Sequence, residues 1–268
     1  MRPLRMGVGV LAMLLLAAVP TRLWAGTAVG TLVQVEGDVE ILRQGKLPPS
    51  PAQRLDSLNP GDVIRTKSNA RAQVRFLDDS LLTIAPGSMV AINEYLYDAP
   101  QGLRRAVVNV FRGLVYSVVR GLLRAEQPTF LMKTHTALLG VRGTEWYTLL
   151  GASYTAAFVE TGQLEVSSLQ KEVVKKVVLL SGETSTVALE QAPTDPVRYP
   201  EVFRRLLKDW LRNGVPEWVI GMPPLELPWL KEPLRLPRVP EHLREFPEGL
   251  FVPPTIRAPE QPGKPNVR

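Results

Sequence analysis

The chain has 268 residues, of which 45% are hydrophobic and 22% charged, and these proportions are those of a folded protein rather than a disordered one. It contains no cysteine, which excludes disulfides, thiol nucleophiles and metal sites built from thiolates. The two histidines, His135 and His242, are far apart in the sequence, so a histidine-rich metal site is not expected either. Most of the 25 prolines lie at or after Pro193, so the chain has two compositional halves.

The first 25 residues have the layout of a secretory signal peptide. Arg2 and Arg5 precede an uncharged apolar run over residues 6–19, and the small residue Ala25 suits the position before a cleavage site. The run is shorter than the ~20 residues that a helix needs to cross a bilayer, so we expect cleavage, with an uncleaved anchor as the alternative. The mature chain is then expected to be periplasmic or extracellular and to have no transmembrane helix.

Removal of this segment also changes the charge of the protein. Residues 1–25 hold three arginines and no acid, so their loss lowers the formal net charge from +6 to +3. A nearly balanced charge with no run of basic residues does not suggest a nucleic-acid partner.

Residues 26–189 alternate between apolar and polar with a period of two. The pairs that carry this alternation are Val33 and Val35, Val39 and Ile41, Val74 and Phe76, Leu82 and Ile84, Val90 and Ile92, and Leu164 and Val166. Such spacing, with β-branched residues and Gly/Asp turns, predicts antiparallel β-structure with one buried face. A glycine followed by a short strand recurs loosely, so both a sandwich and a solenoid-like stack of short strands remain open.

Two segments of this region are ambiguous. Residues 103–125 are long enough for a helix, but their many valines favour two strands that bend at Gly113. In residues 171–178, lysines and Glu172 interleave with valines. This pattern predicts a solvated sheet edge that discourages strand pairing, with a short helix as the alternative.

Three stretches carry a recognisable pattern. They are Gly61-Asp62-Val63-Ile64-Arg65-Thr66 with the later Asp78-Asp79-Ser80, then Pro86-Gly87-Ser88, and finally Thr134-His135-Thr136-Ala137 with Gly140-Val141-Arg142-Gly143-Thr144-Glu145-Trp146. Together with the turn at Gly162, they resemble the FecR domain over about residues 29–187. The resemblance implies an exported β-domain used for binding. We expect structural roles for its motif residues Gly61, Asp62, Thr66, Thr134, Gly140, Val141, Arg142, Gly143, Thr144, Glu145 and Gly162.

The chain departs from the family pattern at several points. Asp79 stands where the family usually has glycine, although Asp tolerates a left-handed turn, and His135 replaces the usual proline. The best-known members are anti-sigma regulators of iron uptake, with a cytoplasmic domain and a membrane helix ahead of the periplasmic part. Here the FecR-like domain follows the signal peptide directly, so we expect a stand-alone exported protein without the transmembrane signalling role.

The sequence offers no convincing constellation for an enzyme, a cofactor or a metal. Asp78 and Asp79 are adjacent and predict a water-exposed hairpin turn rather than a carboxylate pair across a cleft. Ser168-Leu169-Gln170-Lys171 matches a motif of penicillin-recognising enzymes, but its Lys-Thr-Gly companion is missing. Arg142 is expected to hold a bend, by bonding carbonyls or Glu145, with an exposed recognition pair as the alternative. We therefore expect no catalytic, cofactor-binding or metal-binding residue.

The spacing predicts one amphipathic helix over residues 201–213, after Pro200 and before Gly214. Its apolar face is expected to pack on the core, with a groove of a partner as the alternative, and consists of Val202, Phe203, Leu206, Leu207, Trp210 and Leu211. Residues 215–254 form a Pro-rich apolar strap that either wraps the β-domain or docks on another protein, which makes Trp218 and Trp229 candidate partner-binding residues. Residues 255–268 are polar and expected to be disordered.

The prediction is therefore an all-β fold: one FecR-like β-domain over residues 26–189, a connector and amphipathic helix over 190–214, and the Pro-rich tail. The expected function is that of a non-enzymatic exported binding or scaffold module that recognises an envelope protein in sensing or assembly. A cell-wall or polysaccharide-binding domain is the alternative. Exposed aromatics along one β-face would favour the polymer, and an exposed apolar patch would favour a protein partner.

Overall fold

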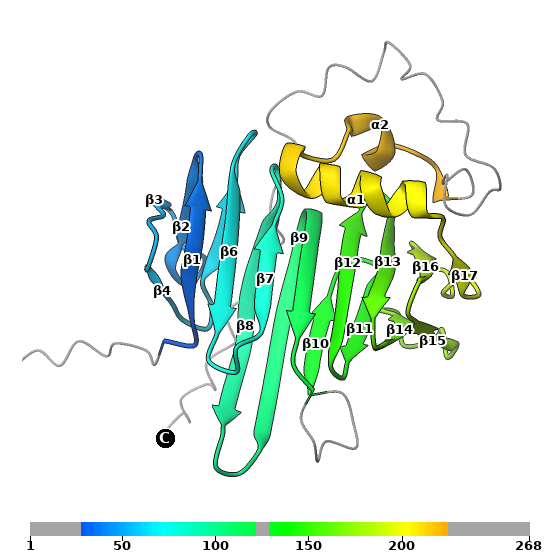
Figure 1. Ribbon diagram of the computed structural model, residues 1–268, viewed down its shortest axis with the longest axis horizontal. Helices are drawn as coiled ribbons and strands as arrows, with labels where there is room; N and C mark the ends of the chain where they lie inside the picture. Colours follow the sequence, from blue (N-terminus) through cyan, green and yellow to red (C-terminus); the bar gives the residue numbers. More distant parts are fainter. Residues whose placement is uncertain (1–27, 122–128, 225–268) are drawn as a thin grey trace, which may run out of the picture.

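Strands account for most of the described residues, and they form two sheets that lie face to face (Figure 1). The structure is a computed structural model that describes residues 28–121 and 129–224. The predicted all-β class with one amphipathic helix is confirmed. The predicted signal peptide, Trp229 and the tail over residues 255–268 lie outside the described residues.

Each sheet draws strands from the whole length of the domain. Sheet A contains, in spatial order, β4 (Ser57–Leu58), β1 (Gly30–Glu36), β6 (Arg71–Phe76), β7 (Leu81–Ile84), the second half of β9 (Leu103–Val119), β12 (Thr144–Leu150), β13 (Tyr154–Thr161), β16 (Glu183–Ala188) and β17 (Val197–Arg198). Sheet B contains β3 (Ser50–Pro51), β2 (Val39–Leu42), β5 (Val63–Thr66), β8 (Met89–Asp98), the first half of β9, β10 (Phe130–Lys133), β11 (Ala137–Val141), β14 (Gln163–Ser168) and β15 (Lys176–Leu180). Neighbouring strands are antiparallel except β9 and β10, which run parallel. A 3-10 turn, η1 (Arg43–Gly45), follows β2.

Strand β9 belongs to both sheets. Up to Arg112 it pairs with β8 and β10 of sheet B, and from Gly113 onward it pairs with β7 and β12 of sheet A. Gly113 has a φ of +92°, and a Cβ there would lie 2.1 Å from the Ser88 hydroxyl. Two strands bending at Gly113 were expected over residues 103–125. The structure corrects this to one strand of 17 residues, because its pairing passes from one sheet into the other without a break.

The chain turns through a residue of positive φ wherever it passes between the sheets within the described segments. These residues are Gly37, Leu55, Gly61, Asn69, Gly87, Gly113, Gly143, Gly162 and Gly182. The recurring glycines of the sequence therefore mark crossings in a sandwich whose chain winds as in a solenoid. Asp79 also has a positive φ, of 60°, as expected of an aspartate in a left-handed turn.

The main core lies between the two sheets. It is made by the inward-facing residues of both, and its aromatic rings bridge the layers. Phe76 of sheet A stacks on Tyr95 of sheet B with 4.8 Å between ring centroids, and Phe130 of sheet B meets Trp146 of sheet A edge-on. The period-two alternation of the sequence is thus the signature of one face buried in this core.

A second apolar cluster lies on the outer side of sheet A. Helix α1 (Glu201–Asn213) crosses the outer face of sheet A, and α2 (Glu217–Ile220) follows it (Figure 1). Phe203 and Trp210 are buried there, and Phe203 stacks on Phe158 of β13. Core packing of the predicted helix is therefore observed, but Val202 is not on the buried face, since it is 53% exposed.

We predict that Gly162→Ala lowers the free energy of unfolding by about 2 kcal/mol or more, because Ala at a positive φ is strained and its Cβ also needs space. Gly162 has a φ of +89°, and a Cβ there would lie 2.4 Å from the carbonyl oxygen of Gly143. Urea unfolding measures the loss.

Gly182→Ala is the matched control. Gly182 has a φ of +81°, and a Cβ there would have no other atom within 4 Å, so the substitution carries the backbone strain without the clash. If both variants lost the same free energy of unfolding, the close contact between Gly162 and Gly143 would not contribute to stability.

Candidate binding site

The first of the three FecR-like stretches, residues 61–66, holds the loop between β4 and β5 in place. Asp62 is buried, and its Oδ2 accepts hydrogen bonds from Arg43 Nη1 at 2.8 Å and from the backbone N–H of Asn59 at 3.0 Å. Its Oδ1 accepts from the backbone N–H of Gln44 at 3.0 Å. A carboxylate with every oxygen committed to neighbouring backbone and one guanidinium serves the fold at this corner.

Thr66 ties this stretch to the second one. Its hydroxyl donates to the carbonyl oxygen of Ala85 at 2.7 Å and accepts from the backbone N–H of Ser88 at 2.9 Å. Both partners flank the Pro86-Gly87 turn, where the chain passes from sheet A to sheet B. The threonine therefore holds a crossing in place.

The third stretch, from β11 to β12, forms another crossing. Val141 is in the core, and the Thr144 hydroxyl donates to the carbonyl oxygen of Gln163 beside Gly162. Glu145 accepts a hydrogen bond from the Tyr116 hydroxyl at 3.0 Å, and Arg142 is exposed at the turn itself. These contacts fix the third stretch at the crossing.

Thr134 connects the two sheets at a different place. Its hydroxyl accepts from the backbone N–H of Ala137 at 2.9 Å and lies 2.7 Å from the Thr155 hydroxyl on β13. Thr136 also donates to Thr155, at 2.8 Å. His135, between them, is exposed in the turn from β10 to β11.

A buried ion pair, which the sequence did not suggest, lies at the opposite end of the sandwich. Asp78 and Arg104 are 2% and 1% exposed, and Arg104 Nη1 donates to Asp78 Oδ2 at 2.6 Å. The Tyr95 hydroxyl donates to Asp78 Oδ1 at 2.5 Å, and Ser80 donates through both its N–H and its hydroxyl. The prediction of a solvated turn is wrong for Asp78 and right for Asp79, which is 63% exposed.

Opposing effects act on the ionisation of this cluster. Burial raises the pKa of Asp78, but hydrogen bonds from Tyr95, Arg104 and Ser80 outweigh it, so the net pKa lies below its usual value. Burial, and then the hydrogen bond to the carboxylate, raises the pKa of Tyr95. The cluster is thus a carboxylate, a neutral phenol and a guanidinium that satisfy one another inside the protein.

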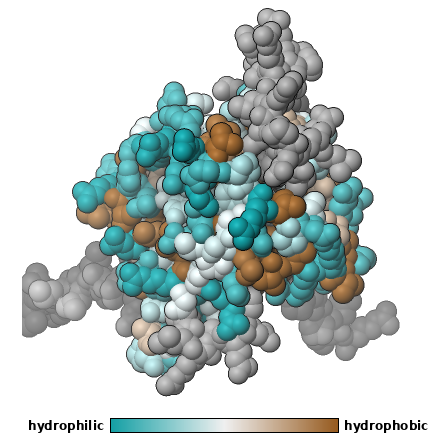
Figure 2. Space-filling view, turned by 45° about the vertical axis from the view of Figure 1, so that its right-hand side comes forward, coloured by the Kyte–Doolittle hydropathy of each residue, from teal (hydrophilic) through white to brown (hydrophobic). Residues whose placement is uncertain are grey.

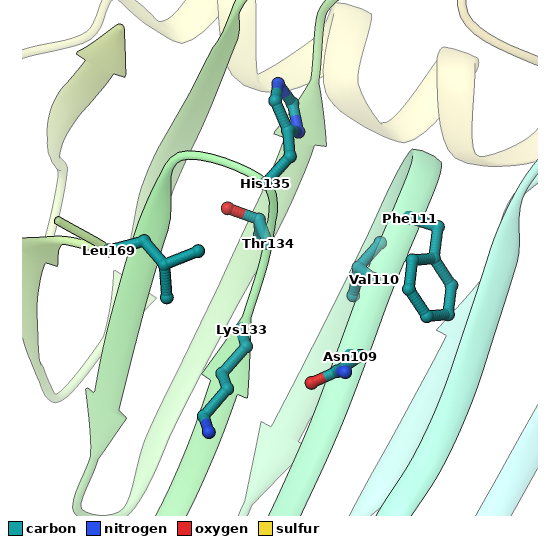
Figure 3. A pocket seen from close by; sticks show the side chains of 7 residues that line it. All are labelled: Asn109, Val110, Phe111, Lys133, Thr134, His135 and Leu169. Atoms are coloured by element: carbon teal, nitrogen blue, oxygen red, sulfur yellow. The ribbon is translucent and has the colours of Figure 1, made fainter. Parts of the chain in front are cut away.

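A groove opens where β9 leaves sheet B. Strand β10 ends at Lys133, opposite Asn109, whereas β9 continues toward Gly113 and sheet A. Residues beyond Asn109 therefore lose their neighbour on this side, and a cavity of about 290 Å³ is left (Figure 3). Its lining is Asn109, Val110, Phe111, Lys133, Thr134, His135 and Leu169.

The chemistry of the groove is apolar with a few polar groups. Val110, Phe111 and Leu169 supply the apolar walls, and the buried Oδ1 of Asn109 has no hydrogen-bond partner. His135 stands at the rim, where its neighbours remove water from part of the ring, and this desolvation lowers its pKa. The groove therefore suits an apolar group.

Sequence reasoning missed the groove. Its residues come from β9, from the end of β10 with the turn that follows it, and from the turn after β14, and these three segments are far apart in the sequence. One signal was present: Asn109 is an amide within the run Val107-Val108-Asn109-Val110, where an apolar residue would be ordinary.

Of the two tryptophans predicted as partner-binding residues, only Trp218 lies within the described residues. It is partly buried against the α1–sheet A cluster and meets Trp210 edge-on, with 6.5 Å between ring centroids. Across residues 28–121 and 129–224, no helix is long and apolar enough to span a bilayer. The same residues contain no group of three or more potential metal-ligating side chains.

One family model matches part of this chain. The family model described as FecR protein matches residues 62–167. Two crystal structures of a "putative anti-sigma factor" from Parabacteroides distasonis ATCC 8503 are similar to this chain. The first is 18% identical with a TM-score of 0.43, over 56% of this chain and 63% of that one. The second is 19% identical with a TM-score of 0.39, over 51% and 59%. The chain thus spans less than two thirds of either, and no curated protein matches it.

We predict that Asp78→Asn lowers the free energy of unfolding by about 3–5 kcal/mol near neutral pH, because it leaves the Arg104 charge buried without a counter-ion. Since the pKa of Asp78 is lowered by folding, its carboxylate stabilises the protein above the ordinary aspartate pKa of about 3.9. That contribution is lost as the pH falls through the lower value of the folded state. Urea unfolding between pH 2 and 7 measures both effects.

Asp79→Asn is the matched control, because Asp79 is exposed in the same turn. It should change the free energy of unfolding by about 0.5 kcal/mol or less. If Asp78→Asn kept the stability of the unsubstituted chain at neutral pH, the buried pair would have no net stabilising role.

Proposed function

Because residues 62–167 of this chain form a FecR domain, we propose that the protein is an exported, non-enzymatic binding module that recognises another protein of the cell envelope in sensing or assembly. A cell-wall or polysaccharide ligand is the competing hypothesis. The two differ in the kind of surface that each would need, and the structure describes that surface.

The observation that carries the proposal is the identity of the exposed apolar side chains. Among the described residues, the large hydrophobic side chains at the surface are all aliphatic. The aromatic rings are buried or partly buried in the two apolar clusters and the groove. Figure 2 shows apolar patches set among polar side chains. Such patches suit a protein partner, whereas sugar polymers are bound by aromatic rings that lie open along a surface.

The groove beside β9 supports the same choice. A largely apolar cavity favours an aromatic or aliphatic anchor side chain of a partner protein. Entry of such a side chain would cover Phe111 and Leu169. We propose this groove as the contact point of the partner.

The state of the buried ionisable groups supports a role without catalysis. Asp78, Tyr95 and Arg104 are already bound to one another and are closed off between the sheets. Groups so arranged add stability to the sandwich, and they are not free to exchange protons with a ligand.

The first test uses a photo-crosslinking residue in place of Leu169, on the rim of the groove, in the full chain in intact cells. We expect one adduct of discrete mass that is sensitive to protease and resistant to cell-wall hydrolase. Phe111→Ala in the same chain should reduce its yield, because the aromatic wall of the groove is removed. Mass analysis of the adduct makes the measurement.

The control places the crosslinker at Leu47, which is 77% exposed near β2 and β3, at the far end of the sandwich from β14 (Figure 1). That position should give no such adduct. An adduct that cell-wall hydrolase destroys, or saturable co-sedimentation of the full chain with purified cell-wall polymer, would establish the polysaccharide hypothesis instead.

We also propose that the protein is exported through residues 1–25 and works in the periplasm or outside the cell. Intact mass measurement of the protein from the envelope fraction should show a chain that has lost these residues and begins at Gly26. Retention of Met1 in the exported protein would contradict cleavage.

A further inference from the structure

The two sheets have four outer edges, and three of them are covered. Two-residue strands β4, β17 and β3 each cap an edge. Further backbone bonds extend this cover: Leu55 N–H donates to Leu32 O, Thr194 N–H to Thr186 O, and Ala52 N–H to Val39 O. Such short, partial strands blunt an edge against pairing with another chain.

The fourth edge is β15, and it differs from the others. It has five residues and lies at the right-hand end of sheet B, outside β14 (Figure 1). In the described part of the chain, one bond is made along its outer side: the backbone N–H of Leu180 donates to the Glu183 carboxylate at 2.9 Å. A carboxylate oxygen thus stands where the carbonyl of a neighbouring strand would stand.

That bond also fixes the direction of the other backbone groups. The Leu180 N–H points away from β14, and alternate residues of a strand direct their backbone groups to the same side. The N–H and C=O of Val178 and Lys176 therefore also face outward. The side chains of Val178 and Leu180 are 51% and 48% exposed, while Val177 and Leu179 face the core.

The lysines of this segment do not block the edge. Lys176 Nζ lies 2.9 Å from Glu165 on β14, and Lys175 Nζ lies 2.7 Å from Asp195. Both ammonium groups are drawn to acids of their own chain. The sequence had suggested that these lysines discourage pairing, and the structure shows the edge strand with both charges paired to acids of the same chain.

We propose that β15 pairs antiparallel with β15 of a second copy of this chain, about a two-fold axis at Val178. This register places Lys176 opposite Leu180 of the second copy, and Val177 opposite Leu179, so that no like charges face each other. Sheet B then continues from one copy into the other. A backbone carbonyl of the second copy replaces Glu183 at the Leu180 N–H, and the exposed valines and leucines cover one another.

The size of the contact sets its strength. Two five-residue edges bury much less than the roughly 1,200–2,000 Å² of a standard stable interface. The pairing is therefore a reversible equilibrium that depends on local concentration, and the free chain keeps Glu183 as its own cap.

The sequence contains no cysteine, so a single introduced cysteine is the only thiol that can form a disulfide between two copies. In an antiparallel hydrogen-bonded pair, opposite Cα atoms lie about 5.5 Å apart, which a disulfide can span. Val178→Cys in the full chain should therefore form a disulfide-linked dimer on mild oxidation. The matched control is Val202→Cys, at an aliphatic position of similar exposure (53%) on α1. We expect at least about tenfold more linked dimer from the first variant at equal concentration, and equal yields would overturn the proposal.

The second experiment tests the register by analytical ultracentrifugation. Since Val178 faces itself across the axis, Val178→Lys and Val178→Glu should each abolish the concentration-dependent rise in mass, and an equimolar mixture of the two should restore it. Val202→Lys should behave as the unsubstituted chain. A mixture that stays monomeric, or single variants that dimerise like the unsubstituted chain, would overturn the pairing. So would an unsubstituted chain that stays monomeric at its highest soluble concentration. Thermal unfolding of each variant checks that it is folded.

Discussion

The repeated passage of the chain between two sheets is the constraint on which this structure depends. Most passages reverse the chain within a few residues, whereas at Gly113 strand β9 runs on from one sheet into the other. Neighbouring passages lie against each other. At Gly162 a methyl group would meet the carbonyl of Gly143, and at Gly113 it would meet Ser88. The crossings therefore interlock backbone to backbone, and glycine provides both the dihedral angle and the space. Most residues of the FecR-like pattern therefore lie at or beside places where the chain passes between the sheets.

Polar contacts hold the layers at their ends, while apolar packing fills the space between. Asp78 on the sheet A side binds Arg104 and Tyr95 of sheet B, and Thr134 of sheet B meets Thr155 of sheet A. Each contact is buried and satisfied, so a shift of one sheet over the other would leave unpaired charges or hydroxyls. Apolar packing alone tolerates sliding more readily than such bonds do. The polar ends thus specify the alignment of the two layers.

The sequence was informative about local geometry and poor at distant pairing. Alternation at Val39 and Ile41, and the helix from Glu201 to Asn213, could be predicted because each depends on residues close in the chain. The burial of Asp78 could not, because its partner Arg104 is 26 positions away and an aspartate beside another in a turn is ordinarily solvated. The groove could not be predicted for the same reason, because it exists only where the end of β10 lies beside the bend of β9. Val202 shows that a correctly predicted helix does not determine which residues of its first turn are buried.

The sharing of β9 between both sheets has a mechanical consequence. In a sandwich of separate sheets, the layers are joined by side chains and loops, and tension on one layer reaches the other through compliant contacts. Here a single extended backbone runs from the hydrogen-bond ladder of sheet B into that of sheet A. A pull on β8 or β10 is therefore transmitted to β7 and β12 along covalent bonds, with Gly113 as the pivot. A displacement of one sheet is therefore coupled to the other through this shared strand.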